Sequence, residues 1–292
     1  MMKLGWIGTG VMGSSMAGHL LAQGHEMFVH NRTREKADGL LGNGAHWCDS
    51  VAEVAAEAEI VFTILGHPSD VFDVYLGESG LLSIEGLCRI MVDMTTSRPS
   101  LARTIARKAA ERGIASLDAP VSGGDIGARD ATLAIMAGGK KEDFEMVLPF
   151  FRCMGKDISL MGGPGAGQHT KMCNQILIAG TMIGVCESLL YASRLGLDQG
   201  AVIDIIGKGA AGSWCINNLG PRLVNADYEP GFFVEHFIKD MEIALQESAA
   251  AGLALPGLAL VHQLYLAVRA QGHDRSGTQA LFMALKTLNA ED

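Results

Sequence analysis

A cluster of polar side chains surrounds one lysine near the middle of the chain. Gln168, Lys171, Asn174 and Gln175 follow one another at spacings of one, three and four residues, so they share one face of a helix. The stretch after them, Ile176 to Ala179, is apolar. An ammonium group can exchange a proton with a reacting atom, and amide groups can hold a polar substrate. We therefore expect chemistry at Lys171.

A glycine-rich stretch near the start of the chain has the spacing of a dinucleotide-binding loop. It follows an apolar segment, Leu4 to Ile7, and precedes a helix-like segment. Gly8 permits a tight turn, Gly10 lets a pyrophosphate approach the backbone, and Gly13 allows close packing of the helix on the strand. Free N–H groups at the helix start then bind phosphates. The candidate cofactor-binding residues here are Gly8, Thr9, Gly10, Val11, Met12 and Gly13.

The end of the second expected strand, Glu26 to His30, bears on the choice of cofactor. An acidic residue at this place would accept hydrogen bonds from the ribose of NAD. This chain instead has Asn31, Arg32 and Thr33, and an arginine with a hydroxyl suits a 2′-phosphate. The alternative is a solvated basic turn. We predict NADP (NADPH) as the cofactor.

These residues need a scaffold, and the first 163 residues alternate strand-like and helix-like segments. Ligands of such parallel sheets bind outside the carboxyl ends of the strands. Ser122, Gly123 and Gly124 offer a hydroxyl and unhindered N–H groups that suit a small carboxylate, although a flexible turn would look the same. Polar or glycine-rich segments follow five expected strands: Gly8–Gly13, Asn31–Thr33, Leu65–Pro68, Thr95–Thr96 and Ser122–Gly124.

The second half of the chain reads as helical throughout. Glycines and a proline precede about thirty residues without proline, which suit one long helix. We expect an α/β Rossmann-type dinucleotide-binding domain at 1–163, an interdomain helix at 164–195 and an all-α substrate and oligomerisation domain at 196–292. Spacing alone assigns the pair Lys239-Asp240 to a solvated helix face.

Composition excludes several classes of protein. The 292 residues are 48% hydrophobic, as in a globular protein with a large core. The formal net charge of −9 argues against nucleic-acid binding. The longest apolar run, Ile176 to Cys186, is too short to span a bilayer, and no signal peptide is visible. The six cysteines lie far apart, without metal-ligand spacing. We expect a cytoplasmic protein with reduced thiols and no metal site.

Taken together, these segments resemble the β-hydroxyacid dehydrogenases, a group that contains 3-hydroxyisobutyrate dehydrogenase, tartronate semialdehyde reductase and glyoxylate/succinic semialdehyde reductases. The resemblance covers essentially the whole chain, in the order of the family. The matching segments are Gly8–Gly13, Val92–Pro99, Asp118–Gly124, Gly165–Asn174 and Ile238–Met241.

The resemblance implies roles for individual residues. Lys171 would be the catalytic acid/base, Asn174 a substrate contact, and Thr96 a contact to the nicotinamide riboside. Leu65 and Lys239 would contact the cofactor, while Phe232 and Asp240 would line the substrate pocket. The chain departs from the family at Thr95, where serine is common, and at Gln175, where many members have a second asparagine.

The resemblance also implies an activity. Lysine has a reference pKa near ~10.4, so a protonated lysine is already the acid that a reduction needs. We expect an NADPH-dependent reductase of a semialdehyde or of glyoxylate that associates with itself as a dimer or tetramer. The alternatives are oxidation of 3-hydroxyisobutyrate, imine reduction, and nucleotide binding without catalysis.

Overall fold

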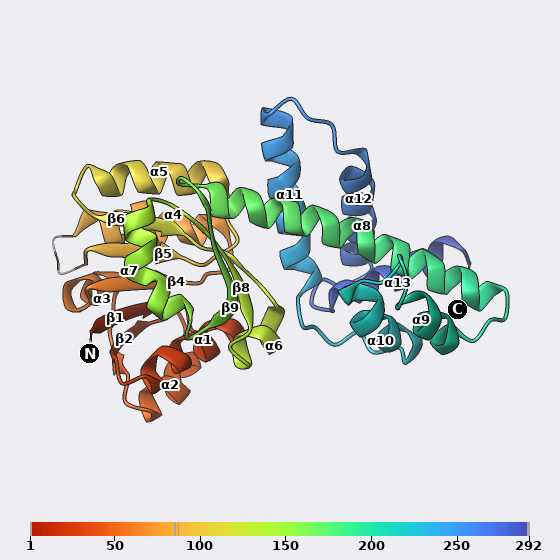
Figure 1. The fold of residues 1–292 in the computed structure, drawn as a ribbon, viewed down its shortest axis with the longest axis horizontal. Coiled ribbons are helices and arrows are strands. Elements are labelled where there is room, and N and C mark those ends of the chain that lie inside the picture. The colour runs from red at the N-terminus through yellow and green to blue at the C-terminus, as the bar shows by residue number, and fades with distance from the viewer. Residues whose placement is uncertain (1, 85, 87, 291–292) are drawn as a thin grey trace. The chain divides into compact units, whose positions relative to one another are not determined.

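The structure, a computed structural model, describes residues 2–84, 86 and 88–290. It divides into two compact units, Met1–Lys171 and Met172–Asp292, which are described separately below. The division falls within one continuous helix, α8 (Ala166–Arg194), which is drawn in green in Figure 1. Positions 1, 85, 87, 291 and 292 belong to the domain ranges expected from the sequence but lie outside the described residues.

Unit 1 is built on a nine-stranded sheet with the order β3-β2-β1-β4-β5-β6-β8-β7, and β9 pairs with β8. The first six strands of this order are parallel to one another. They reproduce the Rossmann order 3-2-1-4-5-6, which confirms the expected fold class. The strands are β1 (Lys3–Ile7), β2 (Glu26–His30), β3 (His46–Trp47), β4 (Ile60–Thr63), β5 (Ile90–Asp93), β6 (Ala115–Asp118), β7 (Val121–Ser122), β8 (Leu133–Gly138) and β9 (Gly155–Gly162).

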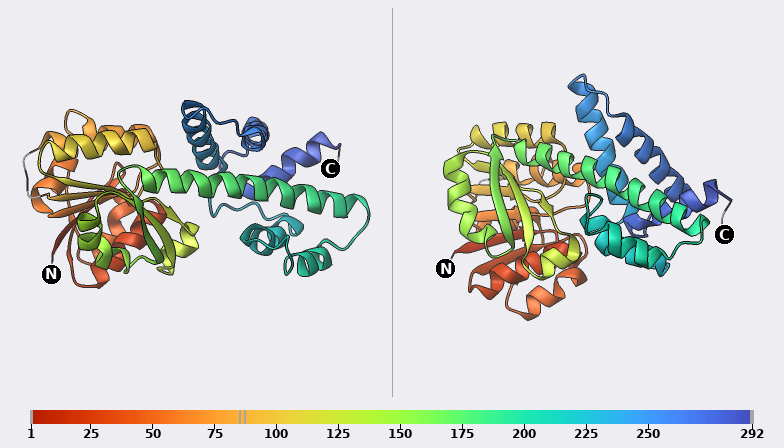
Figure 2. Two further views of the ribbon diagram at one scale, coloured as in Figure 1. Left: turned by 45° about the horizontal axis from the view of Figure 1, so that its top comes forward. Right: turned by 45° about the vertical axis from the view of Figure 1, so that its right-hand side comes forward.

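Helices cover both faces of this sheet (Figures 1 and 2). One apolar core joins the sheet to α1 (Val11–Ala22), α2 (Asp38–Gly42), α6 (Gly124–Arg129) and α7 (Lys141–Phe151). A second core, on the other face, joins it to α3 (Val51–Glu57), α4 (Pro68–Leu76) and α5 (Pro99–Ala110). Short 3₁₀ turns occupy Arg34–Ala37 and Leu81–Ser83. Because both faces are covered, a ligand can reach the parallel strands mainly at their ends.

The carboxyl ends of the central strands lie at one edge of the sheet. Ile7 pairs with Thr63, Thr63 with Asp93, and Asp93 with Asp118, so the loops after β1, β4, β5 and β6 start side by side. The strand order reverses between β1 and β4. A crevice at such a reversal is where doubly wound sheets bind dinucleotides.

Unit 2 is helical, as the sequence predicts. Its helices pack around one core to which α8 contributes Met182, Cys186 and Leu189. Among its described residues the only β-pairing is an isolated bridge between Phe233 and Gly277. The helices after α8 are α9 (Gln199–Ile206), a π-helical turn (Cys215–Leu219), α10 (Gly220–Val224), α11 (Val234–Ala250), α12 (Pro256–Ala270), a 3₁₀ turn (Thr278–Ala280) and α13 (Leu281–Leu288).

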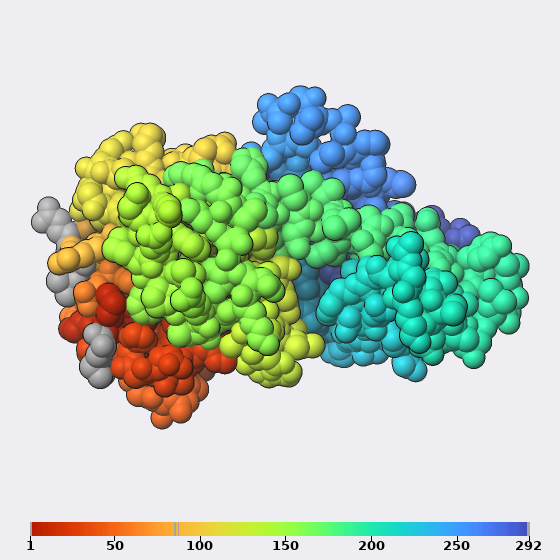
Figure 3. Space-filling model, in the orientation of Figure 1, coloured from red at the N-terminus to blue at the C-terminus, as the bar shows by residue number. Residues whose placement is uncertain are grey.

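Helix α8 is longer than the apolar run that the sequence analysis considered. Its 29 residues are long and apolar enough to cross a membrane by length and composition alone. The core helix of a globular protein passes the same test, and α8 contributes buried side chains to the core of unit 2. Part of it also lies on the surface (Figure 3). Leu177 and Tyr191 of this helix are exposed. Its composition is therefore weak evidence for a membrane span.

Candidate active site

The glycine-rich loop between β1 and α1 needs its glycines for two different reasons. Gly8 has a φ of +101°, and a Cβ there would lie 2.1 Å from the carbonyl oxygen of Ile64. A Cβ on Gly13 would lie 2.0 Å from the carbonyl oxygen of Gly8. Gly10, by contrast, has no atom within 4 Å of its missing Cβ. Gly8 and Gly13 thus permit the packing of the loop, while Gly10 leaves open space beside the helix start.

The groups around this space fit an anionic ligand. Helix α1 has no side-chain cap, so its first N–H groups remain available to a phosphate. The hydroxyl of Thr9 is buried and makes no hydrogen bond. The backbone N–H of Thr9 donates to Oδ1 of Asn31 at 3.2 Å, which ties the loop to the end of β2. The residues present therefore suit the pyrophosphate of a dinucleotide.

Arg32 extends from the turn after β2. Its side chain is 90% exposed, and its guanidinium lies 3.7 Å from Oδ1 of Asp70, an ion pair too exposed to hold it firmly. Arg34 instead stacks over the ring of Trp47 at 5.0 Å. Thr33 is exposed and directly precedes the 3₁₀ turn. Of the two arginines, Arg32 is the one free to turn towards a ligand at this strand end.

The turn after β5 is organised by a buried carboxyl group. Oδ1 of Asp93 accepts hydrogen bonds from the hydroxyl of Thr63 and from the N–H of Thr95, both at 3.0 Å. The hydroxyl of Thr95 accepts the N–H of Leu65 at 2.8 Å, which joins the ends of β4 and β5. Thr96, half-buried, follows directly. The serine common in the family would keep this hydroxyl.

Burial raises the pKa of Asp93 from 3.8 to about 6, against the opposing effect of the hydrogen bonds from Thr95 and Thr63. A raised pKa means that folding favours the protonated carboxyl. The stability that Asp93 contributes is therefore complete below about pH 4 and is lost as the pH rises through about 6. The difference between the two pKa values corresponds to at most about 3 kcal/mol.

This linkage can be measured with Asp93→Asn, whose amide oxygen can still accept both hydrogen bonds. Relative to the variant, the wild type is expected to lose up to about 3 kcal/mol of unfolding free energy between pH 4 and pH 7. Urea unfolding of the apoprotein at several pH values measures the difference. The exposed Asp204→Asn serves as the control. A difference between wild type and Asp93→Asn that is flat across this range would contradict the prediction.

Ser122, Gly123 and Gly124 join β7 to α6. Gly123 has a φ of +132° and Gly124 a φ of +64°, both in the region that disfavours residues with a side chain. The turn thereby starts α6 two residues after Ser122. The carboxylate-binding role of this segment stays a prediction.

Lys171 lies on α8 with only 6% of its surface exposed. The start of α8 is bonded to the end of β6, because Asp118 accepts the N–H of Gly165 at 2.7 Å and that of Gln168 at 2.9 Å. Burial raises the pKa of Asp118, and these N–H groups oppose that effect. The lysine therefore follows a helix start that is fixed to the sheet.

The candidate residues of unit 2 form a hydrogen-bonded chain. Nδ2 of Asn174 donates to Oε1 of Gln175, and Nε2 of Gln175 donates to Oδ2 of Asp240, both at 2.7 Å. Nζ of Lys239 lies 3.1 Å from Oδ1 of Asp240, although this contact does not have the geometry of a hydrogen bond. Asp240 is fully buried and Lys239 nearly so. The expectation of a solvated Lys239-Asp240 face was therefore wrong, because α11 turns this pair inward.

Phe232 is half-buried just before α11, where its ring meets Phe237 edge-on at 6.1 Å. Trp214, by contrast, is largely exposed. Both lie within unit 2. The pocket-lining role expected of Phe232 stays a prediction.

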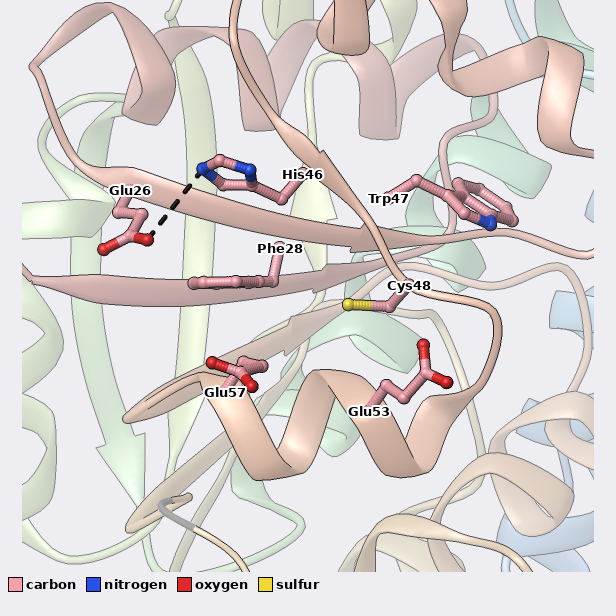
Figure 4. A pocket seen from close by; sticks show the side chains of 7 residues that line it. All are labelled: Glu26, Phe28, His46, Trp47, Cys48, Glu53 and Glu57. Atoms are coloured by element: carbon pink, nitrogen blue, oxygen red, sulfur yellow. Dashed lines mark ion pairs between the residues drawn. The ribbon is translucent and has the colours of Figure 1, made fainter.

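A separate hollow of about 410 Å³ lies beside β2, β3 and α3 (Figure 4). Its lining includes three carboxylates, of which Glu26 faces the ring of His46 at 3.9 Å. Three carboxylates would repel the phosphates of a dinucleotide. The hollow is therefore not the cofactor site. It is lined by Glu26, Phe28, His46, Trp47, Cys48, Glu53 and Glu57.

No role was predicted for Asp93 and Asp118, although both lie in segments that carry the family resemblance. In both cases an acidic residue ends a short strand, and in β5 the other residues of the strand are all apolar. A carboxylate at the end of a buried strand is itself buried, and a buried carboxylate needs several hydrogen-bond donors nearby. Here those donors are the groups that hold the strand ends together.

The Rossmann sheet, the uncapped α1 and the open space at Gly10 define a dinucleotide-binding protein. Comparison with known proteins narrows this class. Residues 3–163 match the family model of the NAD-binding domain of 6-phosphogluconate dehydrogenase. Residues 165–285 match that of the NAD-binding domain of NADP-dependent 3-hydroxyisobutyrate dehydrogenase. The chain belongs to the β-hydroxyacid dehydrogenase family, and it is an oxidoreductase of that family.

Individual relatives span nearly the whole chain. A probable 3-hydroxyisobutyrate dehydrogenase-like protein of Arabidopsis thaliana is 50% identical and covers 98% of this chain and 86% of the relative. The 2-hydroxy-3-oxopropionate reductase of Escherichia coli is 38% identical and covers 98% of each. The solved 3-hydroxyisobutyrate dehydrogenase of Mycobacterium tuberculosis with L-serine is 29% identical, with a TM-score of 0.89 over 98% of this chain and 99% of that one.

Proposed function

We propose that the protein is an NADPH-dependent reductase of a short semialdehyde or of glyoxylate, with Lys171 as the general acid. The observation that carries the proposal is the burial of Lys171 on a helix whose first turn is bonded to the strand ends beside Thr96. An ammonium in that position is a proton donor held on a rigid element. The similarity to 2-hydroxy-3-oxopropionate reductase supports the reductive direction.

The residues of the chain divide the work of the reaction. When bound, the nicotinamide supplies a hydride to the carbonyl carbon. Lys171 donates a proton to the carbonyl oxygen, since a protonated lysine stabilises the negative charge that develops there. Ser122 and the N–H groups of Gly123 and Gly124 hold the substrate carboxylate. Asn174 lies one turn after Lys171 on α8, where its Nδ2 donates to Gln175, and it contacts the substrate in this proposal.

The cofactor is held by groups at three strand ends in this proposal. The start of α1 binds the pyrophosphate, Arg32 and Thr33 bind the 2′-phosphate, and Thr96 contacts the riboside next to the nicotinamide. The exposed and weakly paired Arg32 supports NADPH over NADH. Oxidation of 3-hydroxyisobutyrate is the second candidate, because a relative that is 50% identical is described as probably 3-hydroxyisobutyrate dehydrogenase-like.

Initial rates test the proposal. Glyoxylate and the semialdehydes of succinate, tartronate and methylmalonate are assayed with NADPH and with NADH, and 3-hydroxyisobutyrate is assayed with NADP⁺ and with NAD⁺. Reduction of at least one aldehyde with a marked preference for NADPH is the expected result. Turnover of 3-hydroxyisobutyrate alone would favour the second candidate, and activity with NADH alone would refute the cofactor assignment. Self-association, which light scattering measures, and a cytoplasmic location stay predictions.

A further inference from the structure

Gln168 is fully buried, and both ends of its amide bond to one short backbone segment. Its Oε1 accepts the N–H of Ser97 at 2.8 Å, and its Nε2 donates to the carbonyl oxygen of Thr95 at 2.7 Å. The side-chain amide thus pairs with this backbone as the peptide group of a neighbouring strand would, with one bond accepted and one donated. The residue between the two bonds is Thr96.

The backbone of the same glutamine is fixed from another side. Its N–H donates to Asp118 at the end of β6. The preceding Gly167 packs so closely that a Cβ there would lie 2.2 Å from the carbonyl oxygen of Met136. The first turn of α8 therefore cannot move without breaking contacts to the ends of β5, β6 and β8. Lys171 follows three residues after Gln168.

We propose that Gln168 is a positioning residue that sets the Thr95–Ser97 segment against the first turn of α8. It thereby fixes the distance between Thr96 and Lys171, and so between the nicotinamide and the proton donor. This inference rests on the proposed function for its catalytic consequence. The hydrogen bonds themselves do not depend on that function.

The substitution Gln168→Glu tests the inference with little change of shape. A carboxylate can still accept the N–H of Ser97, but it cannot donate to the carbonyl oxygen of Thr95. A displacement of about 1 Å can slow a reaction by about 10²-fold, so we expect kcat to fall by about 10- to 100-fold. NADPH affinity is expected to stay within about threefold, because most of the cofactor contacts lie elsewhere. The primary isotope effect with 4-deuterated NADPH is expected to rise.

The same variant allows a rescue by acid. A protonated glutamic acid can donate to Thr95, so the deficit in kcat relative to wild type is expected to shrink as the pH is lowered. If Gln168→Glu does not fold, Gln168→Met keeps the length of the side chain without a donor. A deficit that is independent of pH in Gln168→Glu would contradict the role of the lost donor.

Gln279 provides a matched control in unit 2. It is 1% exposed, and its Nε2 donates to the carbonyl oxygens of Asp227 and Glu229, both at 3.1 Å. Gln279→Glu is expected to lose comparable thermal stability with an unchanged isotope effect. If Gln168→Glu behaves in the same way, with kcat and the isotope effect unchanged, Gln168 is only structural and the inference fails.

Hydrogen exchange separates this failure from failure of the proposed function. Without cofactor or substrate, the amides of residues 95–97 are expected to exchange about fivefold faster in Gln168→Glu, the change that corresponds to one net hydrogen bond of about 1 kcal/mol. Unchanged exchange would refute the positioning role even in an active enzyme. Faster exchange in a protein that reduces none of the aldehydes would support the contact while refuting the proposed reaction.

Discussion

Replacing Lys171 by alanine is expected to lower kcat by about 10³-fold, within the range that a positioned proton donor contributes. The affinity for NADPH, measured by fluorescence titration, is expected to change less than about twofold, because the proposed cofactor contacts come from the ends of strands and not from Lys171. The loss should fall on kcat, since the proton is transferred only as the carbonyl is reduced.

Two further variants serve as controls for this prediction. Lys171→Met keeps the apolar part of a side chain that is 6% exposed, so its loss of activity cannot be ascribed to a cavity. The exposed Lys208→Ala, between α9 and the π-helical turn, controls for removal of a charge. Turnover of Lys171→Ala at even a tenth of the wild-type rate would exclude the lysine as the general acid.

Replacing Arg32 by serine is expected to reduce the preference for NADPH over NADH by about 10- to 100-fold. A charge-assisted hydrogen bond to a phosphate is worth about 1.5–3 kcal/mol. The substitution removes such a bond to NADPH but none to NADH, which has no 2′-phosphate. The change should therefore appear in kcat/KM for NADPH and leave that for NADH nearly unchanged. Breaking the exposed contact to Asp70 costs little.

Arg34→Ser is the matched control for Arg32→Ser. Both arginines lie in one turn, but Arg34 is stacked on Trp47. Its removal is expected to change the coenzyme ratio less than about threefold. If Arg34→Ser shifts the ratio and Arg32→Ser does not, the wrong arginine has been assigned.

Apart from β3, the strands of the Rossmann order and the long helices could be predicted from the sequence, because each has a run of apolar residues closed by glycine, proline or a polar group. The segment between β2 and α3 was left unassigned. Its helix α2 has five residues, two of them glycine, and β3 has two residues, so neither shows a full period. Packing against neighbouring elements, which the sequence does not display, holds both in place.

Helix α6 was also missed, since Gly123-Gly124 reads as a flexible turn. The helix forms because α1 packs against it, and His19 of α1 bonds to the carbonyl oxygen of Ala128 at 2.9 Å. Because the two residues are more than a hundred positions apart in the sequence, their contact leaves no pattern in the residues around either of them. The glycines that looked like flexibility instead supply the positive φ angles that start the helix.

For the site, spacing grouped Gln168 with Lys171, Asn174 and Gln175 as one polar face. The structure gives each glutamine a separate partner: Gln168 bonds to the backbone after β5, and Gln175 bonds to Asp240. Helical periodicity tells which side chains point the same way, but not which groups they meet. A buried amide therefore looked the same as one that faces a substrate.

The ends of the large sheet have a consequence for how copies of the protein behave in a concentrated solution. At one end β3 offers only two residues to a passing strand. At the other, β9 carries the exposed charges of Lys156 and Asp157, and its pairing with β8 is interrupted by two register shifts. Short, charged or bent edges are poor templates for strands of another chain. The two ends of the sheet thus disfavour edge-to-edge aggregation.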